Sequence, residues 1–302
     1  MINVDTLQRN GKFYNGNTPK FGVIYNGEDY LVKLPKDGLS VYTEFIASNL
    51  IRSLGISCQQ VYLGNSKGVI VNVIKDFTSV NVSLHSFKDT KQSSEDTDIS
   101  TKQYTYRDVI YLIDKHIKLS EVEKIRAKEQ FWDMFICDAI LGNRDRHWGN
   151  WGYLAENGNY RVAPIYDNGA SLFPNVDRTI QEYLESSTRK QFMFDRIFKF
   201  PASLFMIEKP DRCYRTNYYE MFSDLRINKV FANRVKYFKN NISLSLLSSK
   251  CKVILDCSDL QNLPYYLKRF YMEIIVLRYA CIVCRIDFDK IYNKIEEVLG
   301  NV

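Results

Sequence analysis

The sequence has few histidines and a single CxxC motif. It contains 3 His and 7 Cys, and only Cys281 and Cys284 form a CxxC pair. A second CxxC and a neighbouring histidine are both missing, so the pattern does not favour a zinc site. Because the number of cysteines is odd and their spacing is irregular, we interpret them as reduced core residues of a cytosolic protein.

Long uncharged hydrophobic runs are also missing. The first residues, MINVDTLQRNGKFY, lack the basic segment and apolar core of a secretory signal. The run LPYYLKRFYMEIIVLRYACIVC contains Lys268, Arg269, Glu273 and Arg278, so it predicts a buried amphipathic helix and no membrane span. The net charge is only +6 and the basic residues are scattered. This balance is compatible with an anionic ligand such as a nucleotide, whereas direct nucleic-acid binding is not expected. We expect a cytoplasmic protein.

The first 76 residues predict a small antiparallel sheet with one packed helix. Asn26-Gly27 separates two β-like runs and is a strong signal for a two-residue hairpin. Ser40 is a candidate cap for a helix that runs to about Leu54. Two further strands are expected in CQQVYLGNSKGVIVNVIKDF, on either side of a Gly-containing turn.

The chain beyond residue 76 is predicted to be mostly helical. The polar stretch 88–103 reads as an exposed loop, and residues 105–118 as a helix. Ser120 and Glu123 form a capping-box pattern for a helix that ends at Gly142. A hairpin around Asn157-Gly158 follows, and several helices are expected from about residue 178 onwards. The sequence thus predicts an α+β protein with a sheet lobe, residues 1–76, and a larger, mostly helical lobe, residues 77–302.

The stretch LGNRDRHWGN, residues 141–150, places many polar groups directly after an apolar helix. Asp145 and Asn150 are five positions apart, and Asp167 follows the hairpin. Phosphoryl transfer uses such groups: one carboxylate orients the acceptor hydroxyl or takes its proton, while an amide oxygen and a second carboxylate hold Mg²⁺. In protein kinases the catalytic Asp also precedes the metal-binding Asn by five positions.

The sheet lobe contains candidates for the nucleotide contacts of such a site. Lys33 lies at the end of YLVKLP, and Glu44 lies in the first turns of the following helix. A kinase needs a strand lysine that is held against the phosphates by a helix glutamate. Upstream, NGNTPKFG occupies the position of a phosphate loop, although it is neither a Walker A nor a GxGxxG motif.

Taken together, GNRDRHWGNWGYL, APIYDNGASLF, YLVKLP, TEFIASNLIRSLGI and NGNTPKFG resemble HipA-like serine/threonine kinases, the toxin half of bacterial toxin–antitoxin systems. The resemblance implies a bilobal protein-kinase-like fold, ATP and Mg²⁺ as cofactors, a protein substrate with a Ser or Thr hydroxyl, and a cognate antitoxin. The chain resembles the short form, without the extra N-terminal domain of longer members. Family members often carry an autophosphorylated serine in the phosphate loop, where this chain has Thr18.

The resemblance also assigns roles to individual positions. It makes Asp145 the catalytic base, and Asn150 and Asp167 the Mg²⁺ ligands. The residues that it assigns to ATP are Lys33 and Glu44, the phosphate loop with Gly16, Asn17, Thr18 and Lys20, and a hinge with main-chain groups from Val73 to Lys75.

Two other functions fit the same residues. Phosphoinositide kinases also use a DRHxxN loop, so the acceptor could be the hydroxyl of a lipid or another small molecule. A kinase fold with weak or no activity could instead serve as a partner-binding module. Lipid product analysis and Mg-ATP binding, respectively, separate these alternatives from a protein kinase.

Overall fold

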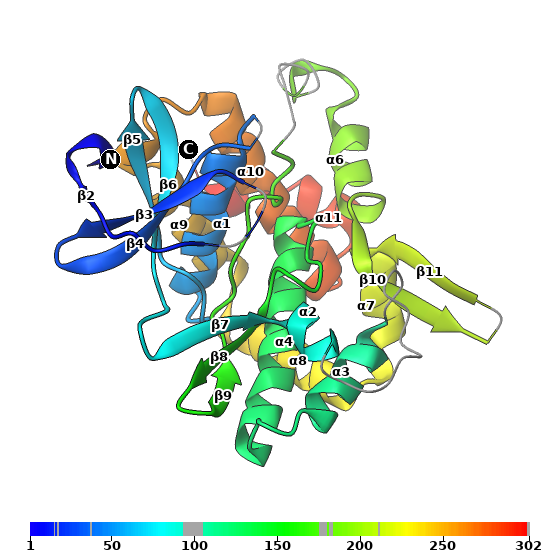
Figure 1. Ribbon diagram of the computed structural model, residues 1–302. Helices are drawn as coiled ribbons and strands as arrows, with labels where there is room; N and C mark the ends of the chain where they lie inside the picture. Colours follow the sequence, from blue (N-terminus) through cyan, green and yellow to red (C-terminus); the bar gives the residue numbers. More distant parts are fainter. Residues whose placement is uncertain are drawn as a thin grey trace.

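The computed structural model of the protein describes residues 1–14, 16, 18–36, 38–92, 105–174, 180, 184–210 and 212–300. Figure 1 shows a sheet-containing N-terminal lobe on one side and a mostly helical C-terminal lobe on the other. This arrangement confirms the predicted α+β class and the division into a small sheet lobe and a larger helical lobe. The boundary at residue 76 itself stays a prediction.

The N-terminal lobe is built on a six-stranded sheet, with the order β1-β5-β6-β4-β3-β2 among the described residues. Strand β1 pairs with β5 in parallel, and the other pairs are antiparallel. Its elements are β1 (Ile2–Asn3), the 3-10 turn η1 (Val4–Thr6), β2 (Gln8–Arg9), β3 (Lys20–Tyr25), β4 (Glu28–Lys33), α1 (Ser40–Ser53), β5 (Val61–Ser66) and β6 (Val69–Lys75).

Local sequence explains the hairpin and the helix of this lobe. Asn26 and Gly27 both have positive φ, at 50° and 76°, as a two-residue hairpin turn between β3 and β4 requires. Helix α1 begins at Ser40, but the predicted cap is wrong. Leu39 occupies the N-cap position without a side-chain hydrogen bond, so the Ser40 hydroxyl does not cap the helix. Nine residues of α1 are buried, so packing stabilises this helix in place of a cap.

A three-stranded antiparallel sheet and a long central helix form the start of the C-terminal lobe. The sheet contains β7 (Val82–Ser86), β8 (Gly152–Glu156) and β9 (Asn159–Val162). Helix α4 (Glu121–Leu141) begins where Ser120 accepts a hydrogen bond from the Glu123 amide, as the capping pattern predicts. It ends at Gly142, which adopts φ 65°. Two shorter helices precede it: α2 (Phe87–Gln92) and α3 (Tyr106–Lys115). The prediction of a loop from residue 88 is wrong at residues 88–92, which belong to α2. The rest of that segment, residues 93–103, lies outside the described residues.

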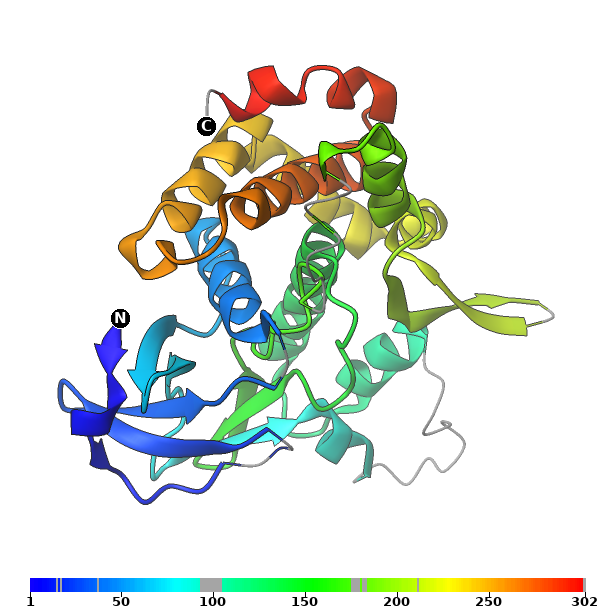
Figure 2. The ribbon, with the colours of Figure 1, turned by 90° about the horizontal axis from the view of Figure 1, so that it is seen from above.

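From residue 184 onwards, the described part of the chain contains helices and a hairpin. Strands β10 (Ala202–Lys209) and β11 (Arg212–Asn217) pair in an antiparallel ribbon that projects from the body (Figure 2). The prediction of helices alone from residue 178 is wrong here, because Ala202–Lys209 and Arg212–Asn217 pair with each other as antiparallel strands. The other elements are α6 (Arg189–Phe198), α7 (Tyr218–Asp224), η2 (Leu225–Ile227), α8 (Lys229–Asn241), α9 (Leu244–Leu255), η3 (Ser258–Leu260), α10 (Tyr265–Arg278), the π-helical turn η4 (Tyr279–Val283), α11 (Phe288–Tyr292) and α12 (Ile295–Leu299).

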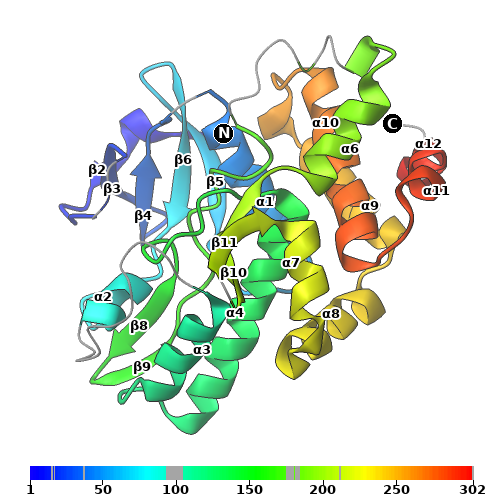
Figure 3. The ribbon, with the colours of Figure 1, turned by 90° about the vertical axis from the view of Figure 1, so that its right-hand side faces the viewer.

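One large hydrophobic core joins the two lobes. Helix α1 packs against the N-terminal sheet on one side and against α9 on the other, as Figure 3 lets the reader follow. Its buried residues, among them Ile46, Leu50 and Ile51, belong to the same core cluster as α4 and α10. The predicted amphipathic helix near residue 270 is the buried helix α10. Within the described residues, none of the helices combines the length and hydropathy that a bilayer-spanning helix needs.

Candidate active site

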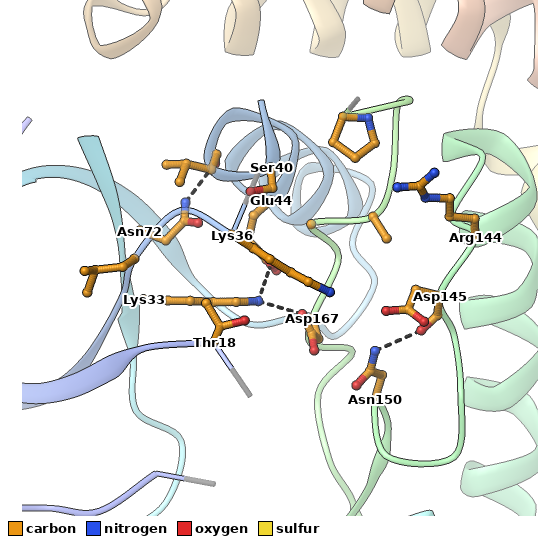
Figure 4. Close-up of a pocket in the computed structure, with 15 residues that line it drawn as sticks. Thr18, Lys33, Lys36, Ser40, Glu44, Asn72, Arg144, Asp145, Asn150 and Asp167 are labelled. Carbon is orange, nitrogen blue, oxygen red and sulfur yellow. Dashed lines mark hydrogen bonds and ion pairs between the residues drawn. The ribbon is translucent and has the colours of Figure 1, made fainter. Parts of the chain in front are cut away.

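A cavity of about 330 Å³ lies where the two lobes meet. Volumes of roughly 300–1,000 Å³ are typical of small-molecule sites. Figure 4 shows that its lining side chains come from the end of β4, from α1, from the loop after α4 and from the segment after β9. The cavity brings together the five side chains on which the prediction of phosphoryl transfer depends, which are Lys33, Glu44, Asp145, Asn150 and Asp167.

Lys33 forms two ion pairs at the back of this cavity. Its Nζ lies 3.0 Å from Glu44 Oε2 and 2.6 Å from Asp167 Oδ1. Burial by itself would lower the pKa of Lys33, but attraction to the two carboxylates raises this pKa above its ordinary value. Burial likewise would raise the pKa of Asp167, and attraction to Lys33 lowers it instead. Both groups are therefore charged at neutral pH.

Glu44 has hydrogen-bond partners in addition to Lys33, and together they fix its position. Its Oε1 accepts hydrogen bonds from the Gln59 side chain and, at 2.7 Å, from the Asn168 amide. The side chain is 1% exposed. The Asn168 amide follows Asp167, whose φ of 58° is uncommon for a residue other than glycine. Glu44 therefore ties helix α1 to the strained segment that carries Asp167, and such strain persists only where surrounding contacts determine it.

Asp145 and Asn150 lie on the loop that follows α4. The Asp145 amide donates to Asn143 Oδ1 at 3.0 Å, and the Asn150 side-chain amide donates to the Asp145 carbonyl at 2.8 Å. The Asp145 carboxylate is half-buried and lines the cavity. In the described part of the chain it has no hydrogen-bond partner, so it can accept a proton or a hydrogen bond from a substrate hydroxyl.

Arg146 is the buried residue that gives this loop its shape. Its guanidinium binds both carboxylate oxygens of Asp138, at 2.9 and 3.0 Å. It also donates to the carbonyls of Asn150 and Tyr166 at 2.7 and 2.5 Å, and to Asn168 Oδ1 at 2.6 Å. One side chain thereby joins helix α4, the Asp145 loop and the Asp167 segment. The sequence analysis did not identify Asp138; a lone carboxylate in the apolar run MFICDAIL was the signal.

The predicted phosphate loop lies beside the cavity in the residues that the structure describes. Thr18 lines it, and Gly16 has φ 116°, which a side chain would strain. Lys20 on β3 lies directly opposite Lys33 on β4 in the antiparallel register, so the two lysine side chains lie on the same face of the sheet. Burial and the charge of Lys33 lower the pKa of Lys20. Asn17 lies outside the described residues.

The structure does not bring Val73 and Lys75 to the cavity. Strand β6 is paired on both sides, by β4 and by β5, and Val73 is fully buried in a separate core with Val23 and Val32. The Lys75 amide donates to the Gln60 carbonyl, and its side chain pairs with Glu28. Because the main-chain groups of Val73 and Lys75 lie in a strand that pairs with neighbours on both sides, the structure does not support the prediction of an adenine contact through these two residues.

Asn72, on the same strand, lines the cavity and was missed. It is 2% exposed, and its side-chain amide donates to the Val41 carbonyl at 2.8 Å. Successive side chains of a strand point to opposite faces, so Asn72 faces α1 where Val73 faces the other core. An asparagine inside the apolar run VIVNVI was the signal that could have identified it.

The residues present fit a magnesium site of the kind found in kinases. Asn150 uses its amide nitrogen in the bond to Asp145, which leaves Oδ1 as the atom for a cation. The Asp167 carboxylate is 40% exposed and lines the same cavity. In the described chain no group of three or more His, Cys, Asp or Glu could hold a metal by itself. Mg²⁺ usually takes one or two carboxylates together with phosphate oxygens, and this pair matches that pattern.

Comparison with known proteins links this geometry to a family. The family model described as the HipA-like C-terminal domain matches residues 14–203. A serine/threonine-protein kinase of Helicobacter pylori, CtkA, is 34% identical over 221 residues, which are 69% of this chain and 65% of that protein. The match thus spans slightly less than two thirds of the length of this relative.

Solved structures show the same similarity. The crystal structure of the H. pylori proinflammatory kinase CtkA matches with a TM-score of 0.81 at 28% identity, over 94% of this chain and 95% of that one. HipA of Shewanella oneidensis, solved with HipB and its operator DNA, matches with a TM-score of 0.56 at 14% identity, over 95% of this chain and 67% of that one. The second similarity concerns the fold alone.

Proposed function

Because the chain belongs to the HipA-like C-terminal domain family, we propose that it is an ATP- and Mg²⁺-dependent serine/threonine protein kinase. The observation that carries this proposal is the meeting of Lys33, Glu44, Asp145, Asn150 and Asp167 in one cavity between the lobes. The similarity to a protein named as a serine/threonine kinase supports the enzyme class that the sequence predicts.

In the proposed mechanism, each of these residues has a separate role in phosphoryl transfer. Lys33, held by Glu44, presents a positive charge to the nucleotide phosphates. Asn150 and Asp167 would hold Mg²⁺, which offsets negative charge on the phosphates. Asp145 orients the acceptor hydroxyl and takes its proton as the new oxygen–phosphorus bond forms and the bond to the ADP leaving group breaks. The family resemblance includes autophosphorylation, for which Thr18 beside the cavity is the candidate.

The Asp145→Asn variant tests this assignment. An amide keeps the size of the side chain but cannot accept the proton, so the turnover number should fall by about 10²–10⁴-fold. Mg-ATP-dependent transfer of labelled phosphate, to the protein itself or to proteins of a cell lysate, gives the measurement. Mg-ATP should still raise the melting temperature of the variant, because Asp145 is not proposed to hold the nucleotide.

The matched control is Asp289→Asn, which removes an exposed carboxylate paired with Lys190 and should leave turnover unchanged. Unchanged turnover in Asp145→Asn would exclude Asp145 as the proton acceptor. Label found in lipid instead of protein would favour the lipid-kinase alternative. The absence of any melting-temperature shift with millimolar Mg-ATP would favour a non-enzymatic partner-binding module.

A toxin role and an antitoxin partner are further parts of the proposal. The S. oneidensis HipA structure contains HipB, the partner in that system, and the resemblance of the sequence motifs points in the same direction. Co-purification of the tagged chain with the product of the adjacent gene tests it. A cytoplasmic location is proposed from the seven cysteines, all of which are unpaired in the structure.

A further inference from the structure

Asn168, the residue directly after Asp167, is a buried polar residue that has no role in the proposed mechanism. Its side chain is 0% exposed. The side-chain amide donates to Ser48 Oγ at 3.0 Å and to Cys58 Sγ at 3.4 Å, and Oδ1 accepts a hydrogen bond from Arg146 at 2.6 Å. One asparagine thus uses both of its donor hydrogens and its acceptor oxygen on three separate segments of the chain.

These contacts join α1 of the N-terminal lobe to the loop after α4 in the C-terminal lobe. Ser48 lies on α1, and Arg146 lies on that loop. The main chain of Asn168 adds a second contact with α1, because its amide donates to Glu44 Oε1 at 2.7 Å. Glu44 and Ser48 are four residues apart, so they lie one turn apart on the same face of the helix. Asn168 therefore holds α1 at two points, and one of them is the carboxylate that pairs with Lys33.

The position of α1 decides whether Lys33 and Glu44 meet. In kinases the strand lysine and the helix glutamate must be paired before the lysine can contact the phosphates, and the position of the helix controls this pairing. A helix attached at one point can turn about that point, whereas two attachments one turn apart oppose both turning and sliding. Glu44 and Ser48 are 1% and 0% exposed, so each hydrogen bond is stronger than it would be in water.

We propose that Asn168 is a positioning residue whose side chain locks α1 onto the Asp167 segment and so keeps Glu44 beside Lys33 for nucleotide binding. Asn168 is not among the described residues that line the cavity, so it acts through Glu44 and does not contact the nucleotide. This inference rests on the proposed kinase function.

Asn168→Ala tests this role, because it removes the side-chain attachment to α1 and leaves every residue that lines the cavity unchanged. The dissociation constant for Mg-ATP, measured by isothermal titration calorimetry, should rise by about tenfold, which corresponds to the loss of one buried hydrogen bond. An unchanged dissociation constant would show that the side chain of Asn168 does not position the site.

Ser48→Ala removes the same attachment from the side of α1 and keeps the contact between Asn168 and Arg146. Its dissociation constant for Mg-ATP should also rise, and the double variant Asn168→Ala, Ser48→Ala should bind no more than about twofold more weakly than Asn168→Ala, because both substitutions remove one shared bond. Multiplied effects would mean that the two residues act independently, contrary to the inference. If Asn168→Ala does not fold, Ser48→Ala alone, with the same expected rise, decides the inference.

A second double variant tests whether Asn168 acts through Glu44. In the Glu44→Gln background the ion pair with Lys33 is already lost, so adding Asn168→Ala should change the dissociation constant by less than about twofold. A further tenfold rise in this background would assign Asn168 a route to the nucleotide that does not include Glu44, and would overturn the inference.

Asn49→Ala is the matched control on the same helix. Asn49 is half-buried, and its side-chain amide donates to the carbonyls of Phe45 and Val61 at 2.9 and 3.0 Å, both in the N-terminal lobe. This variant should lower the melting temperature, since two hydrogen bonds are lost, but keep the dissociation constant within about twofold of the wild type. Equal rises in Asn49→Ala and Asn168→Ala would attribute the weaker binding to a general loss of stability and contradict the inference.

The outcomes also separate this inference from the proposed function. A wild-type chain that neither binds Mg-ATP nor transfers labelled phosphate contradicts the kinase function itself. Binding and transfer by the wild type, together with unchanged dissociation constants in both Asn168→Ala and Ser48→Ala, overturn the inference and leave the kinase assignment intact.

Discussion

Two ion clusters flank the Asp167 segment, and they differ in their access to solvent. Lys33, Glu44 and Asp167 form a cluster that opens into the cavity, where the Asp167 side chain is 40% exposed. Arg146 and Asp138 form a closed cluster in which both side chains are 1% exposed. The open cluster lies on the side of the proposed ligand, and the closed cluster lies beneath the loop.

The difference in exposure indicates that the closed cluster positions the loops of the site, whereas the open cluster is available to bind a ligand. Every strong acceptor around Arg146 belongs to the protein, so the closed cluster fixes the Asp145 loop and the Asp167 segment relative to α4. The open cluster keeps charged groups facing a cavity, where phosphate oxygens and a cation can reach them. A kinase-like site needs both, because charges stabilise a transition state best when they are held in place in advance.

The largest effect is expected when the closed cluster is broken. Arg146→Met should lower the free energy of unfolding by about 3–5 kcal/mol, since it leaves the buried Asp138 carboxylate without its cation. Urea denaturation measures this loss. The double variant Arg146→Met, Asp138→Asn removes both charges and should recover part of the stability.

Arg126→Met gives the matched control for this prediction. Its partner Glu123 lies one turn away on α4 and the arginine is 64% exposed, so its loss should cost no more than about 0.5 kcal/mol. Equal destabilisation by Arg146→Met and Arg126→Met would show that the closed cluster does not hold the loop.

An intermediate effect is expected at the join between α1 and the Asp167 segment. A Cβ at Gly169 would lie 2.9 Å from Glu44 Oε2. Because Glu44 is held by Lys33, Gln59 and the Asn168 amide, Gly169→Ala should displace a fixed carboxylate at a cost of about 1–3 kcal/mol. The displaced Glu44 should weaken Mg-ATP binding, which isothermal titration calorimetry measures.

Gly149→Ala is the control for Gly169→Ala. There the added methyl would meet only the ring of His147, which is exposed and can move. If both variants bound Mg-ATP as the wild type does, the open cluster would not depend on the position of Glu44.

The smallest effect on the free energy of unfolding is expected from a half-buried histidine. His116 is half-buried against the rings of Tyr153 and Tyr160, and its Nδ1 has no hydrogen-bond partner in the described structure. Burial lowers the pKa of His116, and the positive charges of Lys118 and Lys124 act in the same direction. The folded state thus favours the neutral ring, so stability is lost as the pH falls below the ordinary pKa of about 6.5.

His116→Phe keeps a ring in this place and removes its titration. The variant should lose less stability than the wild type between about pH 7 and pH 5, measured by urea denaturation at each pH. His147→Phe is the control, because it removes an exposed histidine without altering a buried site. An unchanged pH dependence in His116→Phe would show that burial of His116 does not contribute to acid sensitivity.

Much of the site could be predicted from sequence spacing. Asp145, Asn150 and Asp167 lie on short segments around a helix end and a hairpin, where local chemistry limits the geometry. The family resemblance inferred from these motifs is confirmed by the family model and by the similarity in sequence and structure to the kinase CtkA. The catalytic and ligand roles of these residues stay predictions.

Other features depended on neighbours distant in the sequence. Asn72 and Val73 are adjacent, and only the packing of α1 against the sheet decides which of them reaches the cavity. Likewise, the sequence shows Arg146 only as one of several polar residues in a loop. Its buried contacts with Asp138 and the Tyr166 carbonyl are visible only in the folded structure. The hairpin of β10 and β11 was missed because its apolar residues match a helix face as well as a strand.

The sequence by itself determined the hairpin turn at Asn26-Gly27 and both ends of α4, and it predicted the set of groups for phosphoryl transfer, because these follow from residue type and short spacing. Only the tertiary structure decided that Lys33, Glu44 and Asp167 share one open cluster while Arg146 and Asp138 share a closed one. The physical reason is that a charged side chain can bind a ligand only if it remains accessible to solvent. Its burial is set by segments that meet only after the chain has folded.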